Sequence, residues 1–340
     1  MQISRRTLLT AAAAITVLPT SSASAKDFYK MSSIAPGTTV YVLQTTFVKT
    51  VAEAHPDIEI QVSATGKATR HNLDAAQYKT DFYMSSPSVF HFMSNKQAMF
   101  ETVEDAPELA RNLRNIFSYP FGSWHFITFA DSGIESLMDI KGKRVFLGPP
   151  GGGAYNAALA MVEGATGFKA DEDFEVVKLG FGPARQAFQD RQTVLHVEPS
   201  AAPAPAFQQF ALTNKIRLLG LSDDDWTNEQ VIEVASVPGR ARGTIAPDAY
   251  GDNQVNTEAV QTLSTIVGLG THNKVPEDVI YMMTKAFWEN TDEVRKVAPW
   301  MSAVTLDNIF LEANMPLHKG AARYYEEIGI EIPDAAKPID

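Results

Sequence analysis

A glycine-rich stretch near the middle of the chain has the composition of an anion-binding turn. The residues before it, 144–147, predict a short buried strand, and residues 157–163 predict a helix that ends at Gly164. A strand, a glycine turn and a helix N-terminus leave unpaired backbone N–H groups directed at one place, where an anion can bind. A tight turn that binds no ligand has the same sequence pattern, so other parts of the chain are needed to distinguish the two interpretations. The stretch runs Gly148, Pro149, Pro150, Gly151, Gly152, Gly153, Ala154, Tyr155.

A second run carries positive charge and follows a strand predicted at residues 58–62. It reads Thr65, Gly66, Lys67, Ala68, Thr69, Arg70, His71, Asn72, and its composition predicts a turn. Arg70 could bind a carboxylate through two parallel hydrogen bonds, with Lys67 as a point charge. Solvated loop charges are the alternative for both residues. Further along, Arg185 is either a second anion clamp or, as we expect, a surface charge.

The sequence predicts no catalytic residue, no metal ligand and no cofactor. The absence of cysteine excludes disulfides, thiolate metal sites and a cysteine nucleophile. The motifs Gly-x-Ser-x-Gly and Gly-x-x-x-x-Gly-Lys-Ser/Thr, which place a nucleophile or a phosphate-binding lysine, are missing. The histidines are scattered, without the spacing of metal ligands; they are His55, His71, His91, His125, His196, His272 and His318.

The N-terminus has the pattern of an export signal. Arg5 and Arg6 precede an apolar segment that extends to Leu18, and small residues at 23–25 mark a cleavage site near Ala25. The arginine pair also fits a twin-arginine signal. We therefore expect a periplasmic protein.

Composition excludes several kinds of partner. The chain has 340 residues, of which 45% are hydrophobic and 20% charged, as in ordinary globular proteins. Removing the two signal arginines from the 29 basic residues leaves 27 against 40 acidic ones, a net charge of −13. This balance argues against binding to nucleic acid or to an anionic membrane surface.

The elements that must position these turns predict an α/β protein. Strands at residues 28–34, 58–62 and 82–84 and a helix over 40–54 have the rhythm of a parallel α/β sheet. A further strand is predicted at 176–181. The segments 126–132 and 262–272 each precede a helix and could cross between two lobes. Two lobes joined in this way enclose a cleft in which ligands bind.

These motifs together resemble the TAXI-type solute-binding proteins of tripartite ATP-independent periplasmic (TRAP) transporters. The resemblance covers essentially the whole chain after the signal. It rests on Thr65-Gly66, on Asp131-Ser132-Gly133-Ile134, on residues 139–145, on Gly151-Gly152-Gly153 and on a closing segment with Pro316-Leu317-His318-Lys319-Gly320. Two hydroxyl side chains of the family are lost here, since Gly152 and Ala154 stand in their places, and Lys67 and Ala68 replace a Gly and a Ser.

The resemblance implies a two-lobed type II periplasmic binding protein fold with a ligand cleft between the lobes. It also implies capture of a small organic anion, a carboxylate or an amino-acid-like solute, by lobe closure. A monomeric protein would then deliver this ligand to the TRAP membrane permease subunits and would not be an enzyme. The implied divisions are a signal at 1–25, lobe I at 26–128 and 265–340 with the C-terminal tail, and lobe II at 129–264. The expected ligand-binding residues are Thr39, Tyr41, Thr65, Gly66, Lys67, Arg70, Ser85, Gly151, Gly152, Gly153, Ala154 and Tyr155.

Other functions share these features. An exported enzyme could use the glycine turn as an anion or oxyanion site. A periplasmic sensor could report ligand occupancy to a membrane kinase with the same fold, and an ABC-type importer could use the same kind of binding protein. Turnover of the ligand and the identity of neighbouring genes would separate these alternatives.

Overall fold

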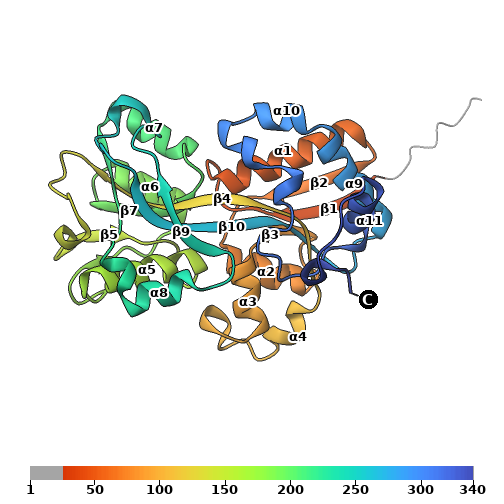
Figure 1. Ribbon diagram of the computed structural model, residues 1–340, viewed down its shortest axis with the longest axis horizontal. Helices are drawn as coiled ribbons and strands as arrows, with labels where there is room; N and C mark the ends of the chain where they lie inside the picture. The colour runs from red at the N-terminus through yellow and green to blue at the C-terminus, as the bar shows by residue number, and fades with distance from the viewer. Residues whose placement is uncertain (1–25, 340) are drawn as a thin grey trace, which may run out of the picture.

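The structure is a computed structural model that describes residues 26–339, so the expected signal lies outside the described residues. The described strands form one mixed sheet in the order β2-β1-β3-β10-β4-β7-β5-β6, with β8 on β4 and β9 on β10 (Figure 1). The strands are β1 (Asp27–Ser32), β2 (Ile58–Ser63), β3 (Phe82–Ser85), β4 (Leu113–Phe129), β5 (Arg144–Phe146), β6 (Glu175–Val176), β7 (Leu195–Ser200), β8 (Ile216–Leu219), β9 (Arg240–Ile245) and β10 (Val260–His272).

Helices surround the sheet in both halves of the molecule (Figure 1). The first half of the chain contributes α1 (Thr39–Ala54), α2 (Ala68–Ala76), α3 (Pro87–Ser94), α4 (Ala106–Ala110) and α5 (Gly153–Thr166). The second half contributes α6 (Phe181–Gln189), α7 (Pro205–Thr213), α8 (Glu229–Ala235), α9 (Glu277–Glu289), α10 (Thr291–Lys296) and α11 (Lys319–Glu327).

The two-lobed α/β architecture is confirmed, because the hydrophobic core divides where β4 and β10 cross. On β4, Phe121 packs into the core of lobe I and Trp124 into a core of lobe II. On β10, Leu263 belongs to lobe II and Val267 to lobe I. The antiparallel pair β4–β10 therefore joins the lobes, and Figure 1 shows both strands running from one to the other.

Lobe I is built from both ends of the chain. In α1, Thr38 caps the helix by accepting a hydrogen bond from the Tyr41 N–H, and Phe47 on the buried face packs against Phe287 of α9 with ring centroids 5.5 Å apart. Such burial of apolar surface is the main stabilising contribution to packing. The strands predicted around residues 28–34, 58–62 and 82–84 and the helix over 40–54 are confirmed within a few residues.

Three local predictions were wrong. Gly164 does not end α5, which continues to Thr166 and is capped by Gly167 in the left-handed conformation. Gly164 instead allows α5 to pack closely against α8, because a Cβ at this position would come within 2.9 Å of Val231. The charged run that we predicted as a turn enters α2 at Ala68, and the strand predicted at 176–181 is short, because α6 begins at Phe181.

Neither a membrane-spanning helix nor a group of three or more potential metal-ligating side chains is found within residues 26–339.

Candidate ligand-binding cleft

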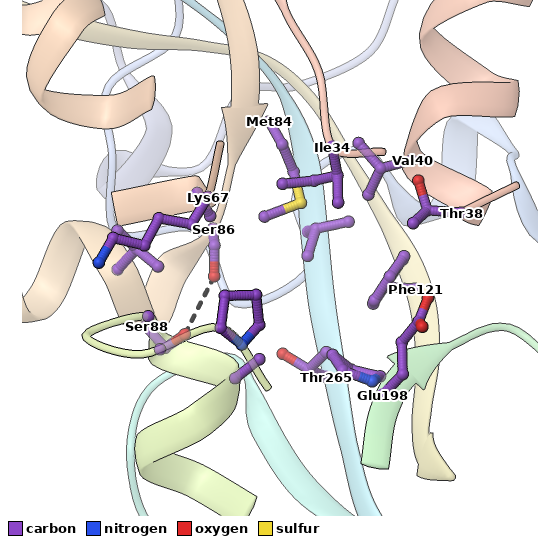
Figure 2. Close-up of a pocket in the computed structure, with 18 of the residues that line it drawn as sticks. Ile34, Thr38, Val40, Lys67, Met84, Ser86, Ser88, Phe121, Glu198 and Thr265 are labelled. Atoms are coloured by element: carbon purple, nitrogen blue, oxygen red, sulfur yellow. Dashed lines mark hydrogen bonds between the residues drawn. The ribbon is translucent and has the colours of Figure 1, made fainter. Parts of the chain in front are cut away.

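A cavity of about 80 Å³ lies where the crossing strands bring the two lobes together. From lobe I and its end of β10 it is lined by Ile34, Thr38, Val40, Lys67, Ala68, Met84, Ser86, Ser88, Val89, Phe121 and Val267. From lobe II and the crossing point it is lined by Trp124, Pro149, Gly152, Gly153, Ala154, Phe181, Glu198, Pro199, Arg240 and Thr265. Figure 2 shows Ile34, Val40, Met84 and Phe121 gathered around this space.

The glycine stretch supplies one wall of the cavity. Gly152 is the N-cap of α5 and Gly153 its first residue, so the first N–H groups of this helix have no acceptor within the helix. The Trp124 indole N–H donates to the carbonyl of Ala154 at 3.3 Å and ties the turn to β4. Backbone donors and the positive end of the helix dipole therefore face the cleft, as expected for an anion site.

Lys67 joins the two lobes. Its Nζ donates to the carbonyl of Pro150 at 2.5 Å, from the start of α2 in lobe I to the glycine stretch of lobe II. Figure 2 shows the ammonium pointing away from the space between Met84 and Thr265. Lys67 therefore lines the cavity with its aliphatic stem, while its charge holds the lobes together.

The expected site residues fall into two groups. Lys67, Gly152, Gly153 and Ala154 line the cavity, whereas Arg70 is exposed on α2 and pairs with Asp74 at 2.9 Å. The remaining seven do not line the cavity either; they are Thr39, Tyr41, Thr65, Gly66, Ser85, Gly151 and Tyr155. Whether any expected residue contacts a ligand stays a prediction.

Several of these residues form hydrogen bonds or packing contacts with other parts of the protein. Thr39 lies 3.4 Å from the hydroxyl of Ser200 in the other lobe, and Ser85 donates to the Asn115 side chain at 2.7 Å. Tyr155 packs against a core of lobe II, and the carbonyl of Thr65 lies 2.6 Å from His71 Nε2.

Arg240, which we did not predict, is the cation of the cavity without an acidic partner. It begins β9 directly opposite Thr265 of β10, at the point where the strands cross. Its NH1 donates to the Val234 carbonyl at 3.3 Å, and its Nε is enclosed without an acceptor. Its guanidinium lies 5.6 Å from the ring centroid of Phe92 and 5.8 Å from that of Trp124, and among the described residues it forms no ion pair with an Asp or Glu. Burial lowers the pKa of Arg240 to about 10, which still leaves it charged at neutral pH. An anion bound in the cavity would stabilise this half-buried cation, which has no carboxylate partner in the described part of the chain, more strongly than the two rings do.

Arg185 is not a surface charge as we expected; it is buried beside Glu198. Its Nε and NH2 donate to the two carboxylate oxygens at 3.0 and 2.5 Å, and its NH1 donates to the carbonyl of Pro36 in lobe I at 2.8 Å. His196 Nε2 lies 3.1 Å from the same carboxylate. Burial acts to raise the pKa of Glu198, but the bonds from His196 and Arg185 outweigh it and lower the pKa.

No local pattern could have revealed Arg240. It is 87 residues beyond Gly153 in the sequence, and the pairing of β9 with β10 brings it to the cavity that the glycine turn also lines. Arg185 and Glu198 are similarly brought together by the packing of α6 against β7.

Comparisons with known proteins agree with this architecture. A family model described as the NMT1-like family matches residues 35–329. A structure titled periplasmic binding protein BugD aligns over 88% of this chain and 94% of its own length, with 10% identity and a TM-score of 0.55. A structure described as a periplasmic transporter aligns over 80% of this chain and 85% of its own, with 15% identity and a TM-score of 0.52. The fold is therefore that of the periplasmic binding proteins.

Proposed function

The chain belongs to the NMT1-like family, and from this membership and the cleft we propose that it is an extracytoplasmic solute-binding protein for a small organic anion. It captures the anion by lobe closure and performs no chemistry on it. The finer assignment that we propose is a TAXI-type receptor. In this assignment a periplasmic monomer, cleaved near Ala25, delivers its ligand to TRAP permease subunits.

The observation that carries this proposal is the pairing of two unsatisfied positive features in one cavity. Arg240 has no acidic partner within residues 26–339, and the N-terminus of α5 presents backbone N–H groups to the same cavity. A carboxylate can satisfy a guanidinium and helix N–H groups together through charge-assisted hydrogen bonds.

The polar side chains of the cavity support binding rather than catalysis. A nucleophile must lie within hydrogen-bond reach of a base. Ser86 and Ser88 bond to each other at 3.0 Å, and Glu198 is held by Arg185 and His196, so no hydroxyl of the described cavity faces a free base. Recovery of unaltered ligand after long incubation supports binding, whereas an altered product would favour the exported-enzyme alternative.

Calorimetric titration of ligand-stripped protein with organic acids and amino acids tests the proposal. We expect stoichiometric binding of an anion that Arg240→Gln weakens by about 100-fold, because a charge-assisted bond is lost. The matched control is Arg242→Gln, two residues along β9, since Arg242 is exposed and pairs with Asp223 outside the cavity. Binding of neutral ligands alone, or equal losses in both variants, would contradict the proposal.

Closure is the proposed mechanism because several hydrogen bonds exist only when the lobes meet. They include Lys67 to Pro150, Arg185 to Pro36 and Thr39 with Ser200. A ligand that bridges the lobes shifts the population toward this arrangement. Small-angle scattering is expected to show a smaller radius of gyration with ligand than without it. A neighbouring permease gene would support the TRAP assignment, and a neighbouring histidine kinase gene would favour sensing.

A further inference from the structure

We propose that the ligand of this cleft is a small monocarboxylate with an apolar body and no ammonium group. This inference rests on the proposed function and narrows its ligand class. It follows from the polar groups of the cavity, which are already satisfied by the protein except at one end, and from the apolar character of the remaining walls.

The cavity offers one anion site. The donors that the protein does not fully satisfy are the Arg240 guanidinium, whose Nε lacks an acceptor while its NH1 donates to the Val234 carbonyl, and the N–H groups at the start of α5. Lys67, the second cation near the cavity, is engaged with the Pro150 carbonyl and directed away. A second carboxylate on the ligand would therefore lie against apolar walls, at the cost of desolvating an unpaired charge.

The cavity offers no carboxylate for an ammonium group. Glu198 is the one acidic residue among the described residues that line it, and its side chain is 2% exposed. Both of its oxygens accept from Arg185, and His196 lies beside one of them. The positive charge of Arg185 already balances this carboxylate, so the α-ammonium of an amino acid would be buried without a counter-ion.

Each hydroxyl group of the cavity also already makes at least one hydrogen bond within the protein. Thr38 donates to the Ala35 carbonyl at 2.9 Å and accepts the N–H of Tyr41. Ser86 and Ser88 bond to each other, as Figure 2 shows, and Thr265 donates to the Gly239 carbonyl at 3.0 Å. A ligand with several hydroxyl groups would leave most of them unpaired when the cleft closes, which is unfavourable.

The walls that face away from the anion site are apolar and close together. Ile34, Val40, Met84 and Phe121 from lobe I face Phe181 from lobe II, and all of these side chains are at most 9% exposed. The cavity has a volume of about 80 Å³ and is partly open to solvent. A short hydrocarbon chain fits this space, and its burial contributes about 0.8 kcal/mol for each CH₂ group.

Isocaproate and leucine give a direct test, because they differ only in the ammonium group. Ligand-stripped protein is titrated by calorimetry with isocaproate, leucine, glutarate and gluconate, the last two adding a second carboxylate or several hydroxyls. We expect isocaproate to bind at least about tenfold more tightly than each of the others, since each adds an unpaired buried polar group. Binding of leucine, glutarate or gluconate as tightly as isocaproate overturns this inference but leaves the proposed function intact. Failure of every organic anion to bind overturns the proposed function itself.

A substitution in the apolar wall tests the inference independently of the anion site. Met84→Gln places an amide in the apolar wall while nearly conserving volume, and we expect about tenfold weaker isocaproate binding with a smaller loss for gluconate. Thermal unfolding of the free variant shows whether it is folded. If folded Met84→Gln binds isocaproate as tightly as the unchanged protein does, the apolar contact is not made and the inference fails. Phenylacetate then measures how large a body the cleft admits, and binding as tight as that of isocaproate would contradict the short-chain limit.

Discussion

Arg185 in α6 holds both carboxylate oxygens of Glu198 in β7, and its remaining amino group reaches across the cleft to the carbonyl of Pro36. The ion pair lies within lobe II, so it persists when the lobes separate. The bond to Pro36 joins the two lobes, so it breaks when they separate. The same guanidinium thus stabilises lobe II itself and, in this arrangement, the contact between the lobes.

Removing the acidic partner of Arg185 is expected to destabilise the protein strongly. Glu198→Gln leaves a buried guanidinium without its counter-ion, which costs about 3–5 kcal/mol. Urea unfolding measures the loss. The control is Glu175→Gln, because Glu175 is 60% exposed and pairs with Arg144 at 3.0 Å on the surface, where about 1 kcal/mol or less is expected. Equal effects of the two substitutions would contradict a buried, compensated pair.

Lys67→Met is expected to weaken ligand binding without removing a ligand contact. The variant keeps the apolar stem but loses the bond to Pro150 that stabilises the closed state. We expect about tenfold weaker affinity, expressed mainly in faster dissociation, as measured by stopped-flow or surface plasmon resonance. Arg70→Gln, one helical turn away and paired with Asp74, is the comparison and is expected to change affinity little. A larger loss in Arg70→Gln than in Lys67→Met would restore Arg70 as the anion-binding residue.

Stability is expected to fall as the pH drops from about 7 to about 5. Burial lowers the pKa of His125 and of His318 to about 4. Burial also lowers the pKa of His71 and His196. Between these values and the unfolded pKa of about 6.5, the unfolded chain binds more protons, so acid favours unfolding by up to about 1.4 kcal/mol per pH unit for each such histidine.

Urea unfolding across this pH range measures the slope. Glu198, whose pKa is lowered, contributes stability that is present above its unfolded pKa of about 4.3, so it changes little in this window. His318→Gln can keep the bonds to the Val275 carbonyl and the Gly320 N–H, and it is expected to reduce the slope. Stability that rises on acidification, or a slope that this variant leaves unchanged, would show that the histidines are not buried in their neutral form.

Gly122→Ala is expected to disrupt the strand crossing. Gly122 has φ of +128°, and a Cβ there would lie 2.1 Å from the carbonyl oxygen of Ser200 in β7. The clash and the strained backbone together are expected to cost about 3 kcal/mol or more. Gly133→Ala separates these two causes, because Gly133 also has a positive φ but nothing lies within 4 Å of its Cβ position. About 1 kcal/mol is expected there, and similar losses at both positions would exclude the close approach as the main cause.

The parts of this structure that depend on neighbouring residues were predictable from sequence. The strand, glycine turn and helix around Gly152 were recognisable because each follows from local backbone preferences. The start of α2 was missed because Lys67 makes no side-chain cap and no capping residue marks the position. Gly164 was misread because its reason, contact with Val231, lies on another helix.

The decisive parts of the site depend on long-range pairing instead. Arg240 reaches the cavity only through its register with Thr265, and Glu198 becomes unavailable to a ligand only because α6 brings Arg185 against it. Neither of these contacts could be predicted from the spacing of the residues in the sequence. The structure adds Arg240 to the candidate cations of the cleft, whereas the predicted ligand contact of Arg70 stays a prediction.

The position of β10 between β3 and β4 also governs the order in which the chain can fold. β3 and β4 do not pair with each other, so their facing edges stay open until residues 260–272 leave the ribosome. Such non-local pairing slows folding and exposes unpaired strand edges for longer. Most of lobe II, whose sequence lies between the two crossing strands, is synthesised before β10. Synthesis of the last quarter of the chain then completes the sheet, and a nascent chain halted before β10 is expected to remain sensitive to proteases in its first hundred or so residues.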